Sequence, residues 1–303
     1  MCECGTAGRV LYVATGKPYL KVAALSVSSL RRVFSGPITL LLTEHPPTAL
    51  QRRFDQQRVE ISVQDVGTPD DWLASRRLKT QLPKYCNDEL CLFVDADTLI
   101  HRSIDTIWDY PTLSAPLAMP ISYEFKTVGS LRASTHMRRV DFAADFRCTY
   151  DHTGAAFPYY TSSTMVWRRT QALVNLFAVW HAEFERFKSC DMLPLARAVH
   201  RTQLPIVRLP ADYCVRNQWK TSACIYTARY PVLLKQYAHQ MPNDFNAITD
   251  ALEQSAVQPA LQPVVKPKAK EVQGICIDKP ACKAHEDGGV NSVLKVMRRK
   301  HKL

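Results

Sequence analysis

Long hydrophobic runs are missing from this sequence. None of its 303 residues belongs to an uninterrupted apolar stretch of about eighteen residues, the length that a membrane-spanning helix needs. The first residues, Met1–Gly5, also lack the charged-then-apolar pattern of a secretion signal. These absences argue against a membrane-spanning or secreted class, and we expect a soluble, cytoplasmic protein.

Paired cysteines are missing as well. The ten cysteines form no C-x2-C pair, the spacing that structural zinc sites commonly use. Because many of them are scattered through predicted core elements and no secretion signal precedes them, we expect reduced thiols rather than disulfides. A zinc site is an alternative only if the termini meet. Its ligands would come from Cys2, Cys4, Cys276, Cys282 and His285.

Charge is unevenly distributed along the chain. The composition, 46% hydrophobic and 22% charged, is that of an ordinary globular protein, but the net charge is +11. Residues 266–303 hold ten Lys or Arg against four Asp or Glu, which is more than half of the excess. We expect a folded domain over residues 1–248 and a flexible, disordered Pro/Lys-rich linker with a basic tail over 249–303. The tail is either simply solvated or contacts an anionic partner, a membrane or a nucleic acid.

Apolar periodicity predicts alternating strands and helices through the first hundred residues. The expected strands are 10–14, 38–43, 59–66 and the run that ends at Asp95 and Asp97, and the expected helices are 19–34, 48–54 and 70–82. This order is typical of a single α/β domain with a mainly parallel central sheet flanked by helices. Ligands of such sheets bind beyond the carboxyl ends of the strands, so the segment Ala14–Thr15 and the segment Asp95–Asp97 should converge there.

Two carboxylates follow the fourth of these strands. Leu90–Val94 is apolar, and Asp95 and Asp97 come after it with one small residue between them. Side chains alternate faces along a strand, so both carboxylates point to the same side and can bind a hard divalent cation that holds a diphosphate. Bare aspartates after a buried strand are costly unless a cation balances them. A strand-end turn with an aspartate as helix cap is the alternative.

The second half of the chain is less regular. We expect a strand at 164–167, an amphipathic helix over 171–187 and a helix over 191–200 with Asp191 as its N-cap. Residues 122–158 are rich in Arg, His, Asp and aromatic residues, which is typical of a functional loop region. Asp145 and Asp151 in this region are candidates for acceptor contacts or for a catalytic base.

Several segments share their order and spacing with a known family. They are Leu11–Thr15, Ser75–Thr80, Phe93–Thr98, Asp191–Ala198 and Leu209–Arg216. Together they resemble the GT-A-type glycosyltransferases with a DxD motif, and most closely the glycogenin-like, retaining family 8 group, over about Arg9 to His239. The resemblance implies a GT-A-type fold and metal-dependent transfer of a sugar from a nucleoside diphosphate sugar, most often a UDP-sugar, with retention and with Mn²⁺ or Mg²⁺ as cofactor.

The resemblance also implies roles for individual residues. Asp97 is the main metal ligand, Asp95 contacts metal and ribose, and His239, placed after an apolar strand, is the third metal ligand, with His200 as a weaker rival. Nucleotide-sugar contacts are assigned to Ala14 and Thr15 at the nucleobase, Lys79 and Arg76 at the donor phosphates, Thr161, Ser162 and Ser163 beside the sugar, and Asp191 at the sugar hydroxyls. Without the resemblance, Lys79 would read as a solvated helix lysine.

The chain departs from the family at four positions. Thr161 stands where Asn is usual, Ser163 where Gly is usual, Met192 where Gln is usual and Cys214 where Asn is usual. These departures leave the donor sugar and the stereochemical outcome open. The acceptor is open too, and could be a glycan, a protein or a modified nucleic acid.

Two other classes of function remain as alternatives. A nucleotidyltransferase has a related sheet, but it usually carries a Gly-rich loop after the first strand, and Thr15–Pro18 is poor in glycine. A catalytically degenerate sugar-binding, nucleotide-binding or scaffold protein would keep the fold without turnover, and the four departures are compatible with it.

Overall fold

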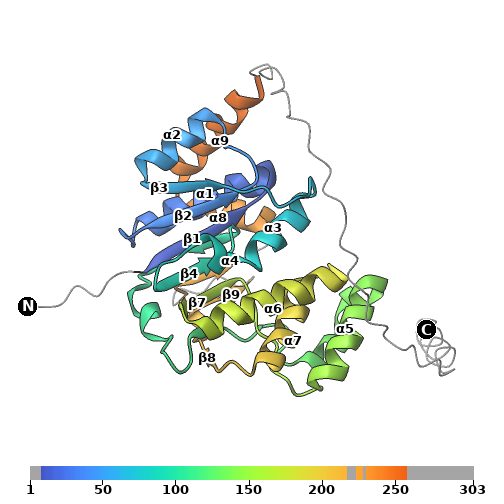
Figure 1. The fold of residues 1–303 in the computed structure, drawn as a ribbon. Coiled ribbons are helices and arrows are strands. Elements are labelled where there is room, and N and C mark those ends of the chain that lie inside the picture. The colour runs from blue at the N-terminus through green and yellow to red at the C-terminus, as the bar shows by residue number, and fades with distance from the viewer. Residues whose placement is uncertain (1–7, 217–222, 228–229, 258–303) are drawn as a thin grey trace, which may run out of the picture. The chain divides into compact units, whose positions relative to one another are not determined.

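A seven-stranded sheet forms the centre of the molecule (Figure 1). The structure is a computed structural model that describes residues 8–216, 223–227 and 230–257. The strand order is β3-β2-β1-β4-β7-β6-β8. The bounds are β1 Arg9–Ala14, β2 Ile38–Leu42, β3 Val59–Val63, β4 Leu90–Val94, β6 Leu117–Met119, β7 Thr164–Arg168 and β8 Ile206–Arg208. Only β7 runs antiparallel to its neighbours in this sheet, so the expected mainly parallel α/β fold is confirmed.

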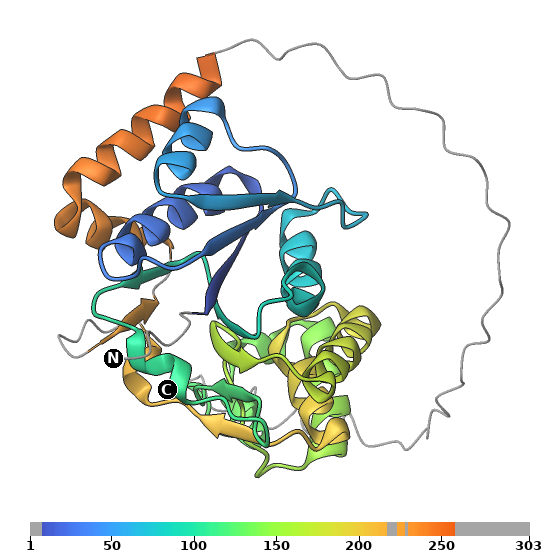
Figure 2. The same ribbon diagram turned by 60° about the vertical axis from the view of Figure 1, so that its left-hand side comes forward.

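Two helical layers cover the two faces of the sheet. One layer holds α1, α2, α8 and α9, and the other holds α3, α4, α6 and α7, as the separate blue-orange and cyan-yellow groups in Figures 1 and 2 show. The bounds are α1 Gly16–Arg31, α2 Thr48–Gln56, α3 Asp71–Lys79, α4 Leu82–Tyr85, α6 Gln171–Phe187, α7 Met192–Thr202, α8 Tyr230–Gln240 and α9 Pro242–Val257. Alternation along β1 serves both layers, because Tyr12 packs into the first core while Leu11 and Val13 pack into the second.

A small second sheet follows directly after the two carboxylates. It has the order β5-β10-β9, with β5 at Thr98–Ile100, β9 at Val215–Arg216 and β10 at Ile225–Thr227. In the ladder Thr227 lies opposite Thr98 and also opposite Arg216. This sheet therefore brings residues more than a hundred positions away beside Asp97.

A third helical group packs against the first half of α7. It consists of α5 Val140–Thr153 and the short 3-10 helices η2 Val128–Ala133 and η3 Thr135–Arg138; the other 3-10 helices are η1 Asp105–Asp109 and η4 Ala211–Tyr213. Its centre is ionic. Arg197 Nη1 lies 2.5 Å from Asp145 Oδ1 and Arg197 Nε lies 2.7 Å from Glu183 Oε2, with all three side chains at most 2% exposed. Thr149 and Ser189 hydroxyls complete the hydrogen bonding of this cluster.

Three expectations from the sequence are wrong here. Residues 122–158 are not a functional loop region, because α5 forms there and buries Asp145 in the ion pair with Arg197. His239 does not follow a strand, because Tyr230–Gln240 is helix α8. The linker does not begin at residue 249, since α9 continues to Val257.

Parts of the sequence analysis fall outside the described residues. They are the basic tail and the candidate zinc ligands Cys2, Cys4, Cys276, Cys282 and His285. Within the described ranges, no helix has both the length and the apolar character needed to cross a membrane.

Replacing Arg197 by methionine tests whether the ionic cluster holds the third helical group. We expect Arg197→Met to lower the free energy of unfolding by about 3–5 kcal/mol, because buried Asp145 loses its counter-charge and Glu183 keeps only the exposed Arg186 and Arg201 as partners. Urea denaturation followed by circular dichroism measures this. Arg186→Met is the matched control, since Arg186 also bridges to Glu183 but is 43% exposed, and it should cost less than about 1 kcal/mol. Equal losses in the two variants would contradict the structural role.

Candidate functional site

Asp95 and Asp97 open into one pocket at the carboxyl end of β4. The pocket has a volume of about 160 Å³ and also contains Arg76, Lys79, Thr161, Ser162, Ser163, Asp191, Met192, Arg216 and Thr227. Backbone hydrogen bonds fix the turn between the two carboxylates: Asp95 N donates to Ser163 O at 2.9 Å, and Thr98 Oγ1 donates to Asp95 O at 2.9 Å. Six predicted site residues from three distant segments, together with the Asp95–Asp97 pair, are therefore neighbours.

Lys79 is the buried cation of this pocket. It is the last residue of α3, it is 4% exposed, and its ammonium lies over the ring of Phe93 at 5.1 Å. Its Nζ lies 2.8 Å from Asp95 Oδ1 and 3.0 Å from Asp191 Oδ2. Burial alone would lower the pKa of Lys79, but the carboxylates of Asp191 and Asp95 outweigh it and raise the pKa. Lys79 is thus a charged bridge rather than a solvated lysine.

Asp191 occupies the N-cap position of α7 without acting as a cap. Its side chain makes no capping hydrogen bond; instead Ser162 Oγ donates to Oδ2 at 2.6 Å, and Arg76 Nε lies 4.0 Å from Oδ1. The buried indole of Trp180 fixes its backbone by donating to Asp191 O at 2.7 Å. Burial alone would raise the pKa of Asp191. The opposing charges of Lys79 and Arg76 outweigh burial, so the pKa lies well below its ordinary range. Asp191 is therefore a fixed carboxylate at neutral pH.

The pKa of Asp97 is shifted in the opposite direction to that of Asp191. Burial, followed by the charge of Asp95, raises its pKa to about 6, against the opposing charges of Lys79 and Arg216. Lys79 makes ion pairs with Asp95 and Asp191 and not with Asp97. The negative charge at Asp97 is therefore only partly compensated within the described residues.

Arg216 and Thr227 are pocket residues that the sequence analysis missed as ligand contacts. Both belong to very short strands of the small sheet, where periodicity gives almost no signal. Thr227 is 6% exposed, and its Oγ1 has no hydrogen-bond partner among the described residues. A buried hydroxyl without a partner is rare and points to an ion or water at that position. The only signal in the sequence is that Thr227 is a polar residue at the end of a short apolar run.

Three hydroxyl residues precede β7 beside Asp191. Thr161 Oγ1 and Ser163 Oγ lie 3.1 Å apart, and Ser163 Oγ lies 3.2 Å from Cys214 Sγ. All three hydroxyl side chains, those of Thr161, Ser162 and Ser163, are at most 8% exposed. They give the pocket neutral donors and acceptors that suit the hydroxyl groups of a sugar.

Ala14 and Thr15 lie at the end of β1 but do not line the pocket. Thr15 Oγ1 donates to Asp71 O at 2.6 Å and so fixes the start of α3, the helix that ends in Lys79. Gly16 follows with φ +74°, and a Cβ there would meet Asp71 Oδ2 at 2.3 Å. This glycine is required by the close approach of α3, not by a phosphate loop.

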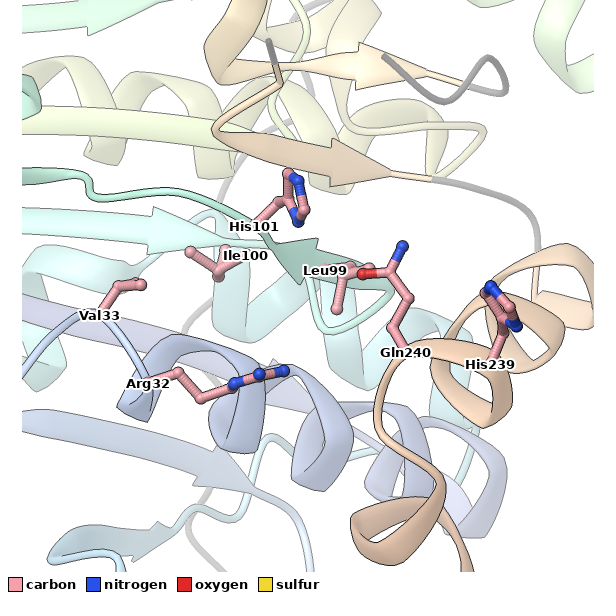
Figure 3. A pocket seen from close by; sticks show the side chains of 7 residues that line it. All are labelled: Arg32, Val33, Leu99, Ile100, His101, His239 and Gln240. Carbon is pink, nitrogen blue, oxygen red and sulfur yellow. The ribbon is translucent and has the colours of Figure 1, made fainter. Parts of the chain in front are cut away.

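The histidine and loop candidates lie elsewhere. His239 lines a separate cavity of about 630 Å³ together with Arg32, His101 and Gln240, as Figure 3 shows. His200 packs its ring against Phe157 at 5.7 Å, and Asp151 is exposed on α5. Among the described residues, no group of three or more His, Cys, Asp or Glu side chains is placed to hold a metal.

Comparison with known proteins gives a fold but no sequence family. No protein-family model matches the chain, and no curated protein matches its sequence. Among solved structures, the bifunctional glycosyltransferase WbbM in its apo form has a TM-score of 0.55 and 12% identity over 82% of this chain, which spans about half (52%) of that protein.

Two further solved structures match this chain over nearly their own full length. Mouse xyloside xylosyltransferase 1, apo form, has a TM-score of 0.51 and 10% identity, covering 72% of this chain and 96% of that one. Galactosyltransferase LgtC in complex with donor and acceptor sugar analogues has a TM-score of 0.51 and 12% identity, covering 83% and 97%. The chain therefore has the GT-A-type glycosyltransferase fold, and identities this low establish the fold alone.

The two aspartates should respond oppositely to neutralisation. We expect Asp97→Asn to raise the melting temperature at pH 7.5 by roughly 2–4 °C, because it removes a carboxylate whose raised pKa marks it as destabilising when ionised. The gain should shrink as pH falls below about 6, where Asp97 of the wild type takes up its proton, and vanish below about 4. Thermal unfolding in EDTA across this pH range measures it.

Asp191→Asn is the control of opposite sign. It removes a partner of the buried Lys79, so it should lower the melting temperature at pH 7.5. Because the pKa of Asp191 is lowered by folding, that loss should be complete above pH about 4 and diminish below it. The same direction of change in both variants at pH 7.5 would disprove the charge assignment.

Proposed function

We propose that this protein is a nucleotide-sugar glycosyltransferase that takes its sugar from a nucleoside diphosphate sugar, with a UDP-sugar as the expected donor and retention as the expected outcome. The observation that carries the proposal is the meeting of Asp95, Asp97, Lys79 and Asp191 in one pocket at the carboxyl end of a strand of a glycosyltransferase fold. Open α/β sheets bind their ligands at this edge.

The residues present fit a hard divalent cation. Asp95 and Asp97 supply carboxylate oxygens, and Thr227 Oγ1, which has no hydrogen-bond partner among the described residues, supplies a third oxygen in the same pocket. Oxygen donors suit Mn²⁺ or Mg²⁺. The cation, when bound, would supply Lewis-acid stabilisation of the departing diphosphate. We propose Thr227 for the third position in place of His239, which lies in a separate cavity.

The remaining residues bind and orient the donor. Lys79 holds the Asp95 carboxylate through its 2.8 Å contact, which leaves Asp97 as the less compensated ligand. Ser162 and Lys79 hold Asp191 as a carboxylate, so Asp191 can accept hydrogen bonds from sugar hydroxyls but has no proton to donate. The hydroxyls of Thr161 and Ser163 lie beside it and complete a polar wall for the sugar. Ala14 and Thr15 stay predictions for the nucleobase.

Two alternatives are separable by experiment. A degenerate binding or scaffold protein would bind a nucleotide-sugar in the same pocket and release it unchanged. A nucleotidyltransferase would form pyrophosphate from a nucleoside triphosphate, and the turn after β1 offers it only Gly16, whose conformation serves the packing of α3. The acceptor, whether glycan, protein or modified nucleic acid, is not specified by the pocket.

A donor panel tests the proposed reaction. With Mn²⁺ present, wild-type protein should slowly hydrolyse at least one member of a panel of UDP- and GDP-sugars, and Asp97→Ala should reduce that rate by about 100-fold or more, because charge stabilisation of the leaving group is lost. Release of nucleoside diphosphate is the readout. Binding without turnover by the wild type would favour the degenerate alternative, and equal turnover by both proteins would remove Asp97 from the chemistry.

A second test distinguishes the two candidates for the third metal ligand. Thr227→Val keeps the shape of the side chain and removes its oxygen, so it should weaken Mn²⁺ binding about tenfold. His239→Ala should leave the affinity unchanged. Titration of Mn²⁺ followed by electron paramagnetic resonance measures both without any turnover. The reverse pattern, with His239→Ala weak and Thr227→Val normal, would restore the prediction made from the sequence.

A further inference from the structure

Three cationic side chains line the pocket, and one of them differs from the others in its ion pairing. Lys79 bridges Asp95 and Asp191, and Arg76 lies 4.0 Å from Asp191. Arg216 makes no ion pair with any carboxylate that the structure describes. Its side chain is exposed, whereas Lys79 is buried. Two of the three cations are therefore engaged in holding the protein's own carboxylates, and Arg216 is available to a ligand.

The small sheet fixes where Arg216 stands. Arg216 ends β9 and lies opposite Thr227 of β10, which in turn lies opposite Thr98, the residue after Asp97. This ladder places Arg216 in the same wall as the two carboxylates, and it lines the pocket with them. A guanidinium that lines the same pocket as Asp95 and Asp97 can reach an anion bound there.

We propose that Arg216 binds the phosphate that departs during sugar transfer and stabilises the negative charge that this phosphate gains. The proposal rests on the proposed function and deepens it by assigning a further catalytic residue. A guanidinium presents paired N–H donors that match two phosphate oxygens, and its charge does not depend on pH in the physiological range.

The charge balance of the reaction explains why one cation should be free. The bond between the anomeric carbon and the phosphate oxygen breaks, and its electron pair stays on that oxygen. A new bond forms between the anomeric carbon and an acceptor oxygen, which loses its proton to the solvent. The nucleoside diphosphate thus leaves with one more negative charge than it had in the donor. An interaction with that added charge is stronger after bond cleavage than before it, which is the requirement for catalysis.

Comparing two ligands tests this assignment. Binding of UDP and of UDP-glucose, each with Mn²⁺, is measured by calorimetry for wild type, Arg216→Gln and Arg216→Lys. We expect Arg216→Gln to weaken UDP binding about 10- to 100-fold and UDP-glucose binding less than about threefold, because only free UDP carries the added charge. Arg216→Lys should recover part of the UDP affinity. With a donor that the wild type hydrolyses, kcat should fall while KM changes little.

Arg52→Gln is the matched control, since Arg52 is exposed on α2 and lies outside the pocket. It removes the same charge and should leave both affinities unchanged. If wild type binds UDP and Arg216→Gln binds it equally well, the assignment of Arg216 is overturned while the proposed function stands. Equal weakening of both ligands would also overturn it, because that is uniform binding. A wild type that binds neither UDP nor GDP with Mn²⁺ overturns the proposed function and this inference together.

Discussion

The buried ammonium of Lys79 is the interaction on which the site depends. It joins the end of α3, the end of β4 and the start of α7 through contacts of 2.8 Å to Asp95 and 3.0 Å to Asp191. A charge that is only 4% exposed is tolerated because two carboxylates compensate it. The same contacts decide the chemistry of the neighbours: Asp191 stays ionised, Asp95 is held in place, and Asp97 is left with a charge that is only partly compensated.

Two buried ionic clusters, one around Arg197 and one around Lys79, can be compared within the described residues. The difference between them distinguishes a cluster that stabilises packing from one that suits a ligand. Around Arg197, the guanidinium contacts the carboxylates of Asp145 and Glu183 and the hydroxyl of Thr149, and all of these side chains are at most 2% exposed. Around Lys79, the pocket wall instead includes the Thr227 hydroxyl, which has no partner within the described part of the chain, and an exposed cation at Arg216. A closed set of charges stabilises packing, whereas an incomplete set requires a ligand to complete it.

The regular part of the fold could be predicted from local pattern, because buried parallel strands and amphipathic helices carry their periodicity in consecutive residues. The pair Asp95 and Asp97 was visible for the same reason. The contact of Lys79 with Asp191 could be expected only through resemblance, since the two residues come together through tertiary packing. The helix at Val140–Thr153 was missed because its buried side includes charged Asp145, whose partner lies on another helix. The apolar run before His239 suits a strand or a helix equally, and the strand that the resemblance implied there is wrong.

The four departures from the family pattern lie together at or beside the pocket. Ser163 and Cys214, both unusual at their positions, contact each other at 3.2 Å, so a hydroxyl and a thiol fill together a place where the family has other groups. Met192 lines the pocket beside Asp191 and brings an apolar surface where an amide is usual. These changes alter the wall that would face the sugar and leave the carboxylates and Lys79 in place. The ionised Asp97, whose charge is only partly compensated, costs folding free energy unless a ligand uses it. An altered sugar wall around an intact ionic centre therefore argues for a changed donor sugar more than for a lost reaction.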